Sequence, residues 1–89
     1  MRDENFDIPV TVETAQTGRF LTVTRVGQAA DLLLYKWPED KKGPRHRAAL
    51  RSLMDAMRDR HAASVAREAF VEAAKEADIF IREGYQFGS

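Results

Sequence analysis

The strongest constraint on how this chain folds is one amphipathic stretch, residues 43–61. Gly43 and Pro44 open it, and proline suits the first position of a helix because its missing N–H would be unpaired there anyway. At 100° per residue a set of larger side chains falls on one face, with Met54 at its flank: Leu50, Leu53, Met57 and His61. The spacing predicts a helix whose stripe packs on the core, with Leu53 near its centre.

A row of arginines follows the same predicted helix, beside the apolar stripe. Arg47, Arg51 and Arg58 fall within roughly 40° of one another, and Arg45 lies in the first turn. Residues 45–60 contain five arginines and two aspartates, a local surplus of three positive charges. The first turn of a helix carries partial positive charge, so basic residues are disfavoured there. We therefore expect some other group to compensate for them.

Two interpretations of this arginine row are open. Free backbone N–H groups at the helix start, together with the guanidinium groups, suit a phosphate or the carboxylates of a partner. Alternatively, the arginines pair with acids of the protein itself, Asp40 or Glu39. The row supplies our main candidate binding residues: Arg45, Arg47, Arg51 and Arg58.

Length and composition limit the remaining possibilities. A chain of 89 residues with 44% hydrophobic content predicts a single domain over residues 1–89, with an ordered core of about 6–82 and a tail at 84–89. Fourteen basic and fourteen acidic side chains give no net charge, which disfavours attraction to membranes or nucleic acid by bulk electrostatics. The absence of cysteine excludes disulfides, and no apolar run resembles a membrane span or a signal peptide. We expect a soluble, cytoplasmic protein.

Two short strands precede the helices. From residue 6 the sequence alternates, and one apolar set of side chains points the same way: Phe6, Ile8, Val10 and Val12. Polar residues at 14–18 end in glycine and indicate a turn. Residues 19–24 then resume an extended, β-branched pattern. The sequence therefore predicts an amino-terminal hairpin.

A first helix is predicted over residues 25–36, because apolar residues recur at steps of three and four: Val26, Ala29, Ala30, Leu33, Leu34 and Trp37. Pro38 ends it, and the connector at 38–43 is short enough to make the first two helices neighbours. Leu32 and Tyr35 fall on the side opposite this apolar face. A partner that covers them would make them binding residues, and we include both as candidates.

Ser64 is the expected N-cap of a third helix, whose inner face carries small residues around one aromatic ring: Ala66, Ala69, Phe70, Ala73 and Ala77. Residues 79–81 form a short run of strand-forming residues. Three helices between the second and third strands return the chain parallel to the second strand, so an all-antiparallel sheet needs the first strand in the middle. The predicted fold is α+β, ββαααβ, a three-stranded antiparallel sheet of order 2-1-3 with three helices on one face.

A resemblance to a known family rests on residues spread along the chain: Phe6, Asp7, Pro9, Val10, Ala29, Leu33, Trp37, Pro38, Ala48 to Leu50, Ala66, Arg67, Ala69, Phe70, Ala73, Ala74 and Ile79. With them the chain resembles, over about residues 6–82, a family of small alphaproteobacterial proteins of the rhizobial type. That family is known only as a domain of unknown function, number 982 of its series. The Trp37–Pro38 pair and the Ala-Arg-x-Ala-Phe-x-x-Ala-Ala run are its most specific parts, and Arg25 departs from the small capping residue expected there. The resemblance implies a fold and a cytoplasmic setting, and no activity or catalytic residue.

Motifs for chemistry are sparse. His46 and His61 lie on or beside the apolar stripe, fifteen residues apart, which is too far for the i, i+4 spacing that lets two histidines on one helix share a metal, so both are interpreted as packing residues. Acidic side chains follow one another at i, i+4 opposite the alanines of the third helix, which is typical of a solvated face: Glu68, Glu72 and Glu76. We predict no catalytic residues, no metal site and no cofactor.

The leading functional hypothesis is a small non-enzymatic interaction or regulatory module that binds an unidentified protein partner. The alternative is nucleic-acid or phosphate-ligand binding through the arginine row, whose affinity would fall steeply with salt. It ranks second because the predicted strands lack an RNA-binding aromatic pair and the net charge is zero. An enzyme ranks third, and no membrane association is expected. Exposed sheet edges and the Leu32–Tyr35 pair favour a homodimer.

Overall fold

The computed structural model describes residues 5–13, 18–59 and 62–84. Its strands and helices follow one another in the order ββαααβ, as predicted: β1 Asn5–Glu13, β2 Phe20–Arg25, α1 Val26–Asp31, α2 Pro44–Arg58, α3 Ala63–Glu76 and β3 Phe80–Glu83. A π-helical segment, η1 Leu32–Lys36, continues α1, and a short 3₁₀ turn, η2 Glu39–Lys41, precedes α2. In the part of the chain described, no helix combines the length and apolar character needed to cross a membrane.

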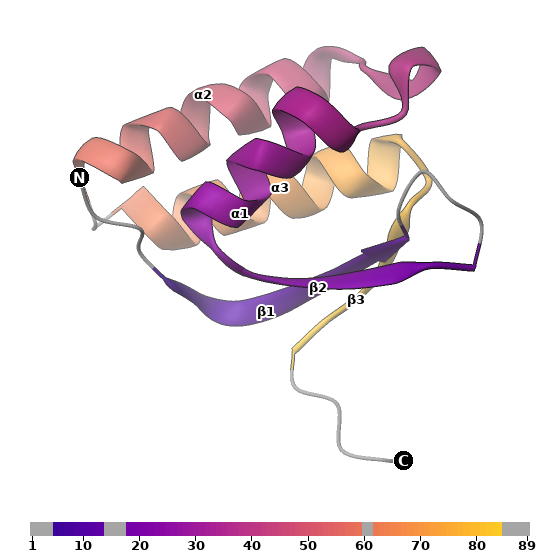
Figure 1. Ribbon diagram of the computed structural model, residues 1–89. Helices are drawn as coiled ribbons and strands as arrows, with labels where there is room; N and C mark the ends of the chain where they lie inside the picture. The colour runs from indigo at the N-terminus through magenta and orange to yellow at the C-terminus, as the bar shows by residue number, and fades with distance from the viewer. Residues whose placement is uncertain (1–4, 14–17, 60–61, 85–89) are drawn as a thin grey trace.

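The three strands form one antiparallel sheet of order β2-β1-β3, which confirms the predicted topology (Figure 1). The alternation in β1 sets its register, since Val10 pairs with Val23 of β2 and both side chains are fully buried. β3 pairs with the other side of β1, with an irregularity where Val12 meets Phe80. Ile79, expected inside the strand, lies just before it and accepts a hydrogen bond from the N–H of Glu13.

All three helices cover the same face of the sheet (Figure 1). α1 and α3 pack on the strands, whereas α2 packs chiefly on α3 and also on α1. Phe70 of α3 is fully buried at the centre of the core. Its ring is tilted against that of Phe6 at a centroid distance of 6.2 Å, and it meets the ring of Trp37 edge-on at 5.9 Å. The core therefore ties β1, the end of η1 and α3 together.

The first helix does not stay α-helical as far as predicted. After Asp31 it changes to i→i+5 bonding, which takes more residues per turn and shifts the side chains that follow around the axis. Leu32 itself still has α-helical dihedrals and donates its N–H to the carbonyl of Gln28, yet it is buried with 2% of its surface exposed, so its predicted place opposite the core is wrong. Leu34, expected in the core, is 40% exposed. Tyr35 is 78% exposed, in agreement with the prediction.

α2 begins at Pro44 with Gly43 as its N-cap, as predicted, and ends at Arg58, while His61 lies outside the described residues. Leu53 is fully buried, which confirms its place in the core. The buried face of α2 is nevertheless rotated about the helix axis relative to the predicted stripe. Besides Leu53, its buried residues are His46, Ala49 and Ala56. Leu50 and Met57 are only half-buried. The alanines of α2 and α3 let these two helices approach closely.

Neither end of α3 has a side-chain cap, and backbone hydrogen bonds close its carboxyl end. It begins at Ala63 and Ala62 is its N-cap without a side-chain hydrogen bond, so the predicted Ser64 cap is wrong. At its other end Ile79 N–H donates to the carbonyl of Ala74 and Asp78 N–H donates to that of Lys75, the pair of bonds of a Schellman motif. Asp78 occupies the left-handed position of this motif with φ 59°, where glycine is usual.

A side chain occupies part of the free edge of β2. The amide of Gln28 accepts a hydrogen bond from the N–H of Thr24 at 2.9 Å and donates one to the carbonyl of Thr22 at 3.4 Å. These two backbone groups belong to an outer strand of the sheet, where they would otherwise meet solvent or another chain. The edge of β2 is thus less open than the prediction of a homodimer assumed.

Candidate binding surface

Three of the four candidate arginines lie on one exposed face of α2. Arg47, Arg51 and Arg58 are all exposed, and the buried residues of the helix lie on the opposite side, against α1 and α3. At 100° per residue Arg45 lies about 120° or more around the helix from these three. The structure therefore separates Arg45 from the other candidates.

Met54 shares this face, although its predicted place was the flank of the buried stripe. It lies between Arg51 and Arg58 along the helix and is 39% exposed. The four side chains follow one another at steps of four, three and four residues, the spacing of a single helix face. We refer to them as the arginine face: Arg47, Arg51, Met54 and Arg58.

The surface has a hollow of about 450 Å³ away from α2's exposed face and a smaller one directly on the arginine face. The smaller hollow has a volume of about 360 Å³ and is lined by Arg47, Ala48, Arg51 and Ser52. Ala48 is short, which leaves room between the longer side chains. Two guanidinium groups and one hydroxyl are donors, so the hollow suits a group that accepts hydrogen bonds and carries negative charge.

The guanidinium groups of the arginine face make no ion pair with any acid among residues 5–13, 18–59 and 62–84. Of the acids expected to neutralise them, Glu39 binds Lys42 instead, with 2.6 Å between Nζ and Oε2. The hydrogen bond from Lys42, and then its charge, lower the pKa of Glu39. Internal pairing with Glu39 therefore does not account for the arginine face.

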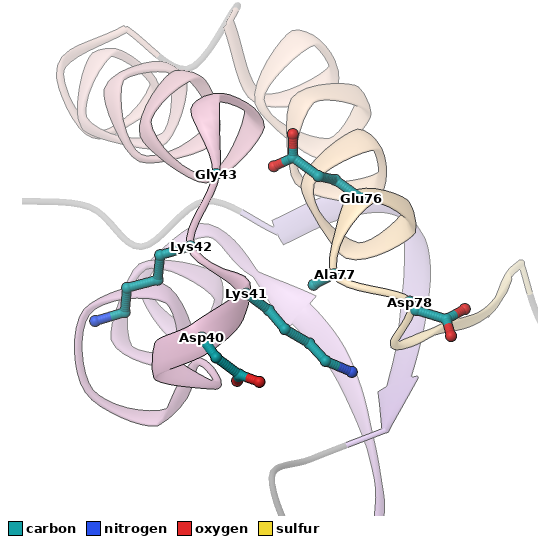
Figure 2. A pocket seen from close by; sticks show the side chains of 7 residues that line it. All are labelled: Asp40, Lys41, Lys42, Gly43, Glu76, Ala77 and Asp78. Atoms are coloured by element: carbon teal, nitrogen blue, oxygen red, sulfur yellow. The ribbon is translucent and has the colours of Figure 1, made fainter.

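The start of α2 is closed by an acid from the far end of α3. Glu76 Oε1 accepts a hydrogen bond from the N–H of Arg45 at 3.1 Å, and its carboxylate lies towards Gly43 (Figure 2). The N–H groups of His46 and Arg47 both point to the carbonyl of Gly43, and Pro44 has none. The N–H groups at this helix start therefore bond within the protein, and binding of a phosphate or of a partner's carboxylates stays a prediction that rests on the guanidinium groups.

Glu76 also supplies the compensation expected for basic residues at the positive end of a helix. Its spacing with Glu68 and Glu72 predicts only a solvated acidic face. Thirty-one residues separate Glu76 from Arg45, so no local motif such as a capping box could identify the contact.

The larger hollow, of about 450 Å³, lies between the connector before α2 and the end of α3 (Figure 2). Its lining mixes two lysines with three carboxylates: Asp40, Lys41, Lys42, Gly43, Glu76, Ala77 and Asp78. Lys42 is paired with Glu39, and Glu76 with the helix start. The described residues nowhere bring together three side chains able to hold a metal ion. The mixture of charges favours neither an anion nor a cation.

The remaining candidates divide between the core and the surface. Leu32 is inside and cannot contact a partner, whereas Tyr35 is exposed beside Leu34. His46 is buried, its Nε2 donates to the carbonyl of Leu33 at 2.8 Å, and its ring lies 5.7 Å from that of Trp37. These contacts give His46 the packing role predicted for it.

A buried arginine outside the predicted binding residues, Arg67, holds α3 to the sheet. Arg67 is 8% exposed; its Nε donates to Asp7 of β1 at 2.9 Å and its Nη1 to Glu83 of β3. Only its place in the family-like run marked it in the sequence. Because two strands share this guanidinium, its role is structural and it is not available to a ligand.

Comparison with known proteins gave one match. The sequence model of a family described as "Protein of unknown function (DUF982)" matches residues 8–81. No match was found among curated proteins or among solved structures.

Proposed function

Because the chain belongs to the DUF982 family of proteins of unknown function, which brings no activity with it, we propose a function from the arginine face alone: a small, non-enzymatic interaction module that binds an acidic protein partner. The observation that carries the proposal is the set of three exposed guanidinium groups on one side of α2, without an ion pair to the described acids.

The placement of charge supports a partner contact in preference to a structural role. α2 carries four arginines and one aspartate, while the chain as a whole is neutral. Arginine forks bind carboxylates in pairs of parallel hydrogen bonds and are enriched in protein interfaces. The helix start is already neutralised by Glu76, so the arginine face does not have to be filled for α2 to form.

The alternative is a phosphate-bearing ligand or nucleic acid at the same surface. The hollow between Arg47 and Arg51, with the hydroxyl of Ser52 beside it, has donors that suit a phosphate as well as a carboxylate. The neutral chain and the apolar Met54 in the middle of the face favour a protein partner. We further propose the cytoplasm as the setting and the alphaproteobacteria as the source.

Stability provides a first experimental check through Arg47→Glu. Without an internal partner to lose, the variant should keep the melting temperature of the wild-type protein or raise it slightly, since a glutamate in the first turn gains about 0.3–1 kcal/mol from the helix dipole at low salt. A lowered melting temperature in calorimetry would mean that an acid of the protein engages Arg47 and would remove the main support for the proposal.

Binding provides the decisive check. Tagged protein is used to capture partners from native lysate, with and without nuclease, as wild type, as the double variant Arg47→Glu/Arg51→Glu, and as the control Arg19→Glu/Lys36→Glu, which reverses two other exposed basic residues. We expect a protein that resists nuclease, is retained by the control and is lost by the double variant. Loss with nuclease would support the nucleic-acid alternative. Equal capture by all three proteins would contradict both.

A further inference from the structure

We infer that the arginine face binds an acidic amphipathic α-helix, which lies along α2 with carboxylates against the guanidinium groups and an apolar side chain against Met54. This inference rests on the proposed function and specifies the shape and chemistry of the partner.

The spacing along α2 favours a helix over an extended segment. At 1.5 Å per residue, Arg47, Arg51 and Met54 follow one another at intervals of about 6 and about 4.5 Å, and Arg58 lies about 6 Å further on. A partner helix packed at a small crossing angle repeats the same unequal intervals along its own face. A strand presents side chains on one face at uniform intervals of about 6.6 Å, so it would lose register over the roughly 16 Å of the arginine face.

The apolar member of the face distinguishes the partner from a polyanion. Met54 is 39% exposed and separates Arg51 from Arg58. A nucleic-acid backbone carries one charge per nucleotide and would place a phosphate near the thioether of Met54, which has no hydrogen-bond donor. An amphipathic helix can instead place an apolar side chain there, and methionine adapts its shape to such contacts. The aliphatic stems of the neighbouring arginines extend this apolar centre.

The hollow beside the first turns fits one of the partner's carboxylates. Arg47 and Arg51 stand on either side of Ala48, and Ser52 completes the lining of about 360 Å³. A carboxylate that enters between the two guanidinium groups gains charge-assisted hydrogen bonds without displacing any ion pair formed by the described residues. A carboxylate seven residues beyond the one opposite Arg51 then meets Arg58.

The experiment compares two capped synthetic peptides of identical composition and high helix propensity. The patterned peptide carries glutamates and one leucine at the steps of four, three and four residues that match the arginine face, and the permuted peptide distributes the same residues around the helix. A single-stranded oligonucleotide of equal charge is the third probe. Each is titrated into the ¹⁵N-labelled full-length protein, and backbone amide shifts give the dissociation constant.

We expect the patterned peptide to bind about fivefold more tightly than the permuted one, the factor that modest apolar burial supplies, with shifts centred on residues 47–58. Met54→Gln, which keeps the length of the side chain, should reduce that difference, because the apolar contact is lost while the glutamates of the patterned peptide stay aligned with the arginines. Arg19→Glu should leave it unchanged, and the emission of Trp37 checks that each variant is folded.

Equal affinity for the two peptides, abolished by Arg47→Glu/Arg51→Glu, would overturn the helical partner and leave the proposed function standing. Tighter binding of the oligonucleotide than of either peptide would overturn both in favour of the nucleic-acid alternative. Absence of binding by all three probes at millimolar concentration would overturn the helical partner, and the capture experiment would then decide the proposed function separately.

Discussion

The substitution Gly43→Ala tests how strongly the start of α2 is coupled to Glu76 at the end of α3. A Cβ added to Gly43 would lie 2.6 Å from Oε1 of Glu76 and 2.8 Å from its Cδ, closer than nonbonded atoms approach. Gly43 has φ −104° and ψ −166°, an extended conformation that alanine also adopts. The added methyl therefore displaces the Glu76 carboxylate and does not strain the backbone.

Displacement of the carboxylate should lower the free energy of unfolding by about 1 kcal/mol, within a range of about 0.5–2 kcal/mol, because the Arg45 N–H loses its acceptor and the positive helix end loses its counter-charge. Glu76→Ala removes the same contact directly. Since both substitutions break one interaction, the double variant should be destabilised by about 1 kcal/mol less than the sum of the two single variants.

Urea unfolding measures these free energies, with the fluorescence of the single tryptophan, Trp37, as the signal. Trp37 is 4% exposed, so its emission should change when the core opens. Glu72→Ala, on the same helix and facing solvent, is the matched control and should be additive with Gly43→Ala. Additivity between Gly43→Ala and Glu76→Ala within about 0.5 kcal/mol would refute the coupling.

Three further predictions concern the core, the end of α3 and association. Leu53→Ala should cost about 2–5 kcal/mol of unfolding free energy, because the side chain is fully buried, and a loss below about 0.5 kcal/mol would be incompatible with that position. Asp78→Gly should raise the free energy of unfolding by about 0.5–1 kcal/mol, because glycine adopts the left-handed conformation of this residue without strain. A lower free energy of unfolding would show that the Asp78 carboxylate makes a stabilising contact. Light scattering tests the homodimer, which needs a mass of about twice 10.1 kDa at high concentration; the monomer mass would contradict it.

The fold was predictable where the pattern in the sequence is local and regular. The alternation around Val10 places β1 on the core, and Pro44 marks the first turn of α2. The central position of β1 follows from chain direction once the sheet is taken as all antiparallel, since three helices intervene before β3. These elements depend on residues close together in sequence, so a single sequence is enough to identify them.

The errors arise where distant parts of the chain decide the local structure. Leu32 is buried although it is not part of the predicted apolar stripe, and nothing in the hydrophobic spacing signals the π-helical bonding of the residues that follow it. The alanines at 49 and 56 admit α3 and so turn α2 about its axis relative to the predicted stripe. For the candidate surface, helical spacing placed the three arginines correctly together, while the role of Glu76 required the tertiary structure.

Gln28 gives β2 a boundary that a regular strand would not have. With one donor and one acceptor, its side-chain amide bonds to Thr22 and Thr24 as the N–H and C=O of one residue in a fourth, parallel strand would do. Glutamate at position 28 would lack the donor, and asparagine would fall one methylene short of reaching both groups. A strand that adds to this edge must first displace the Gln28 amide, so its new backbone hydrogen bonds at Thr22 and Thr24 replace existing ones and add none.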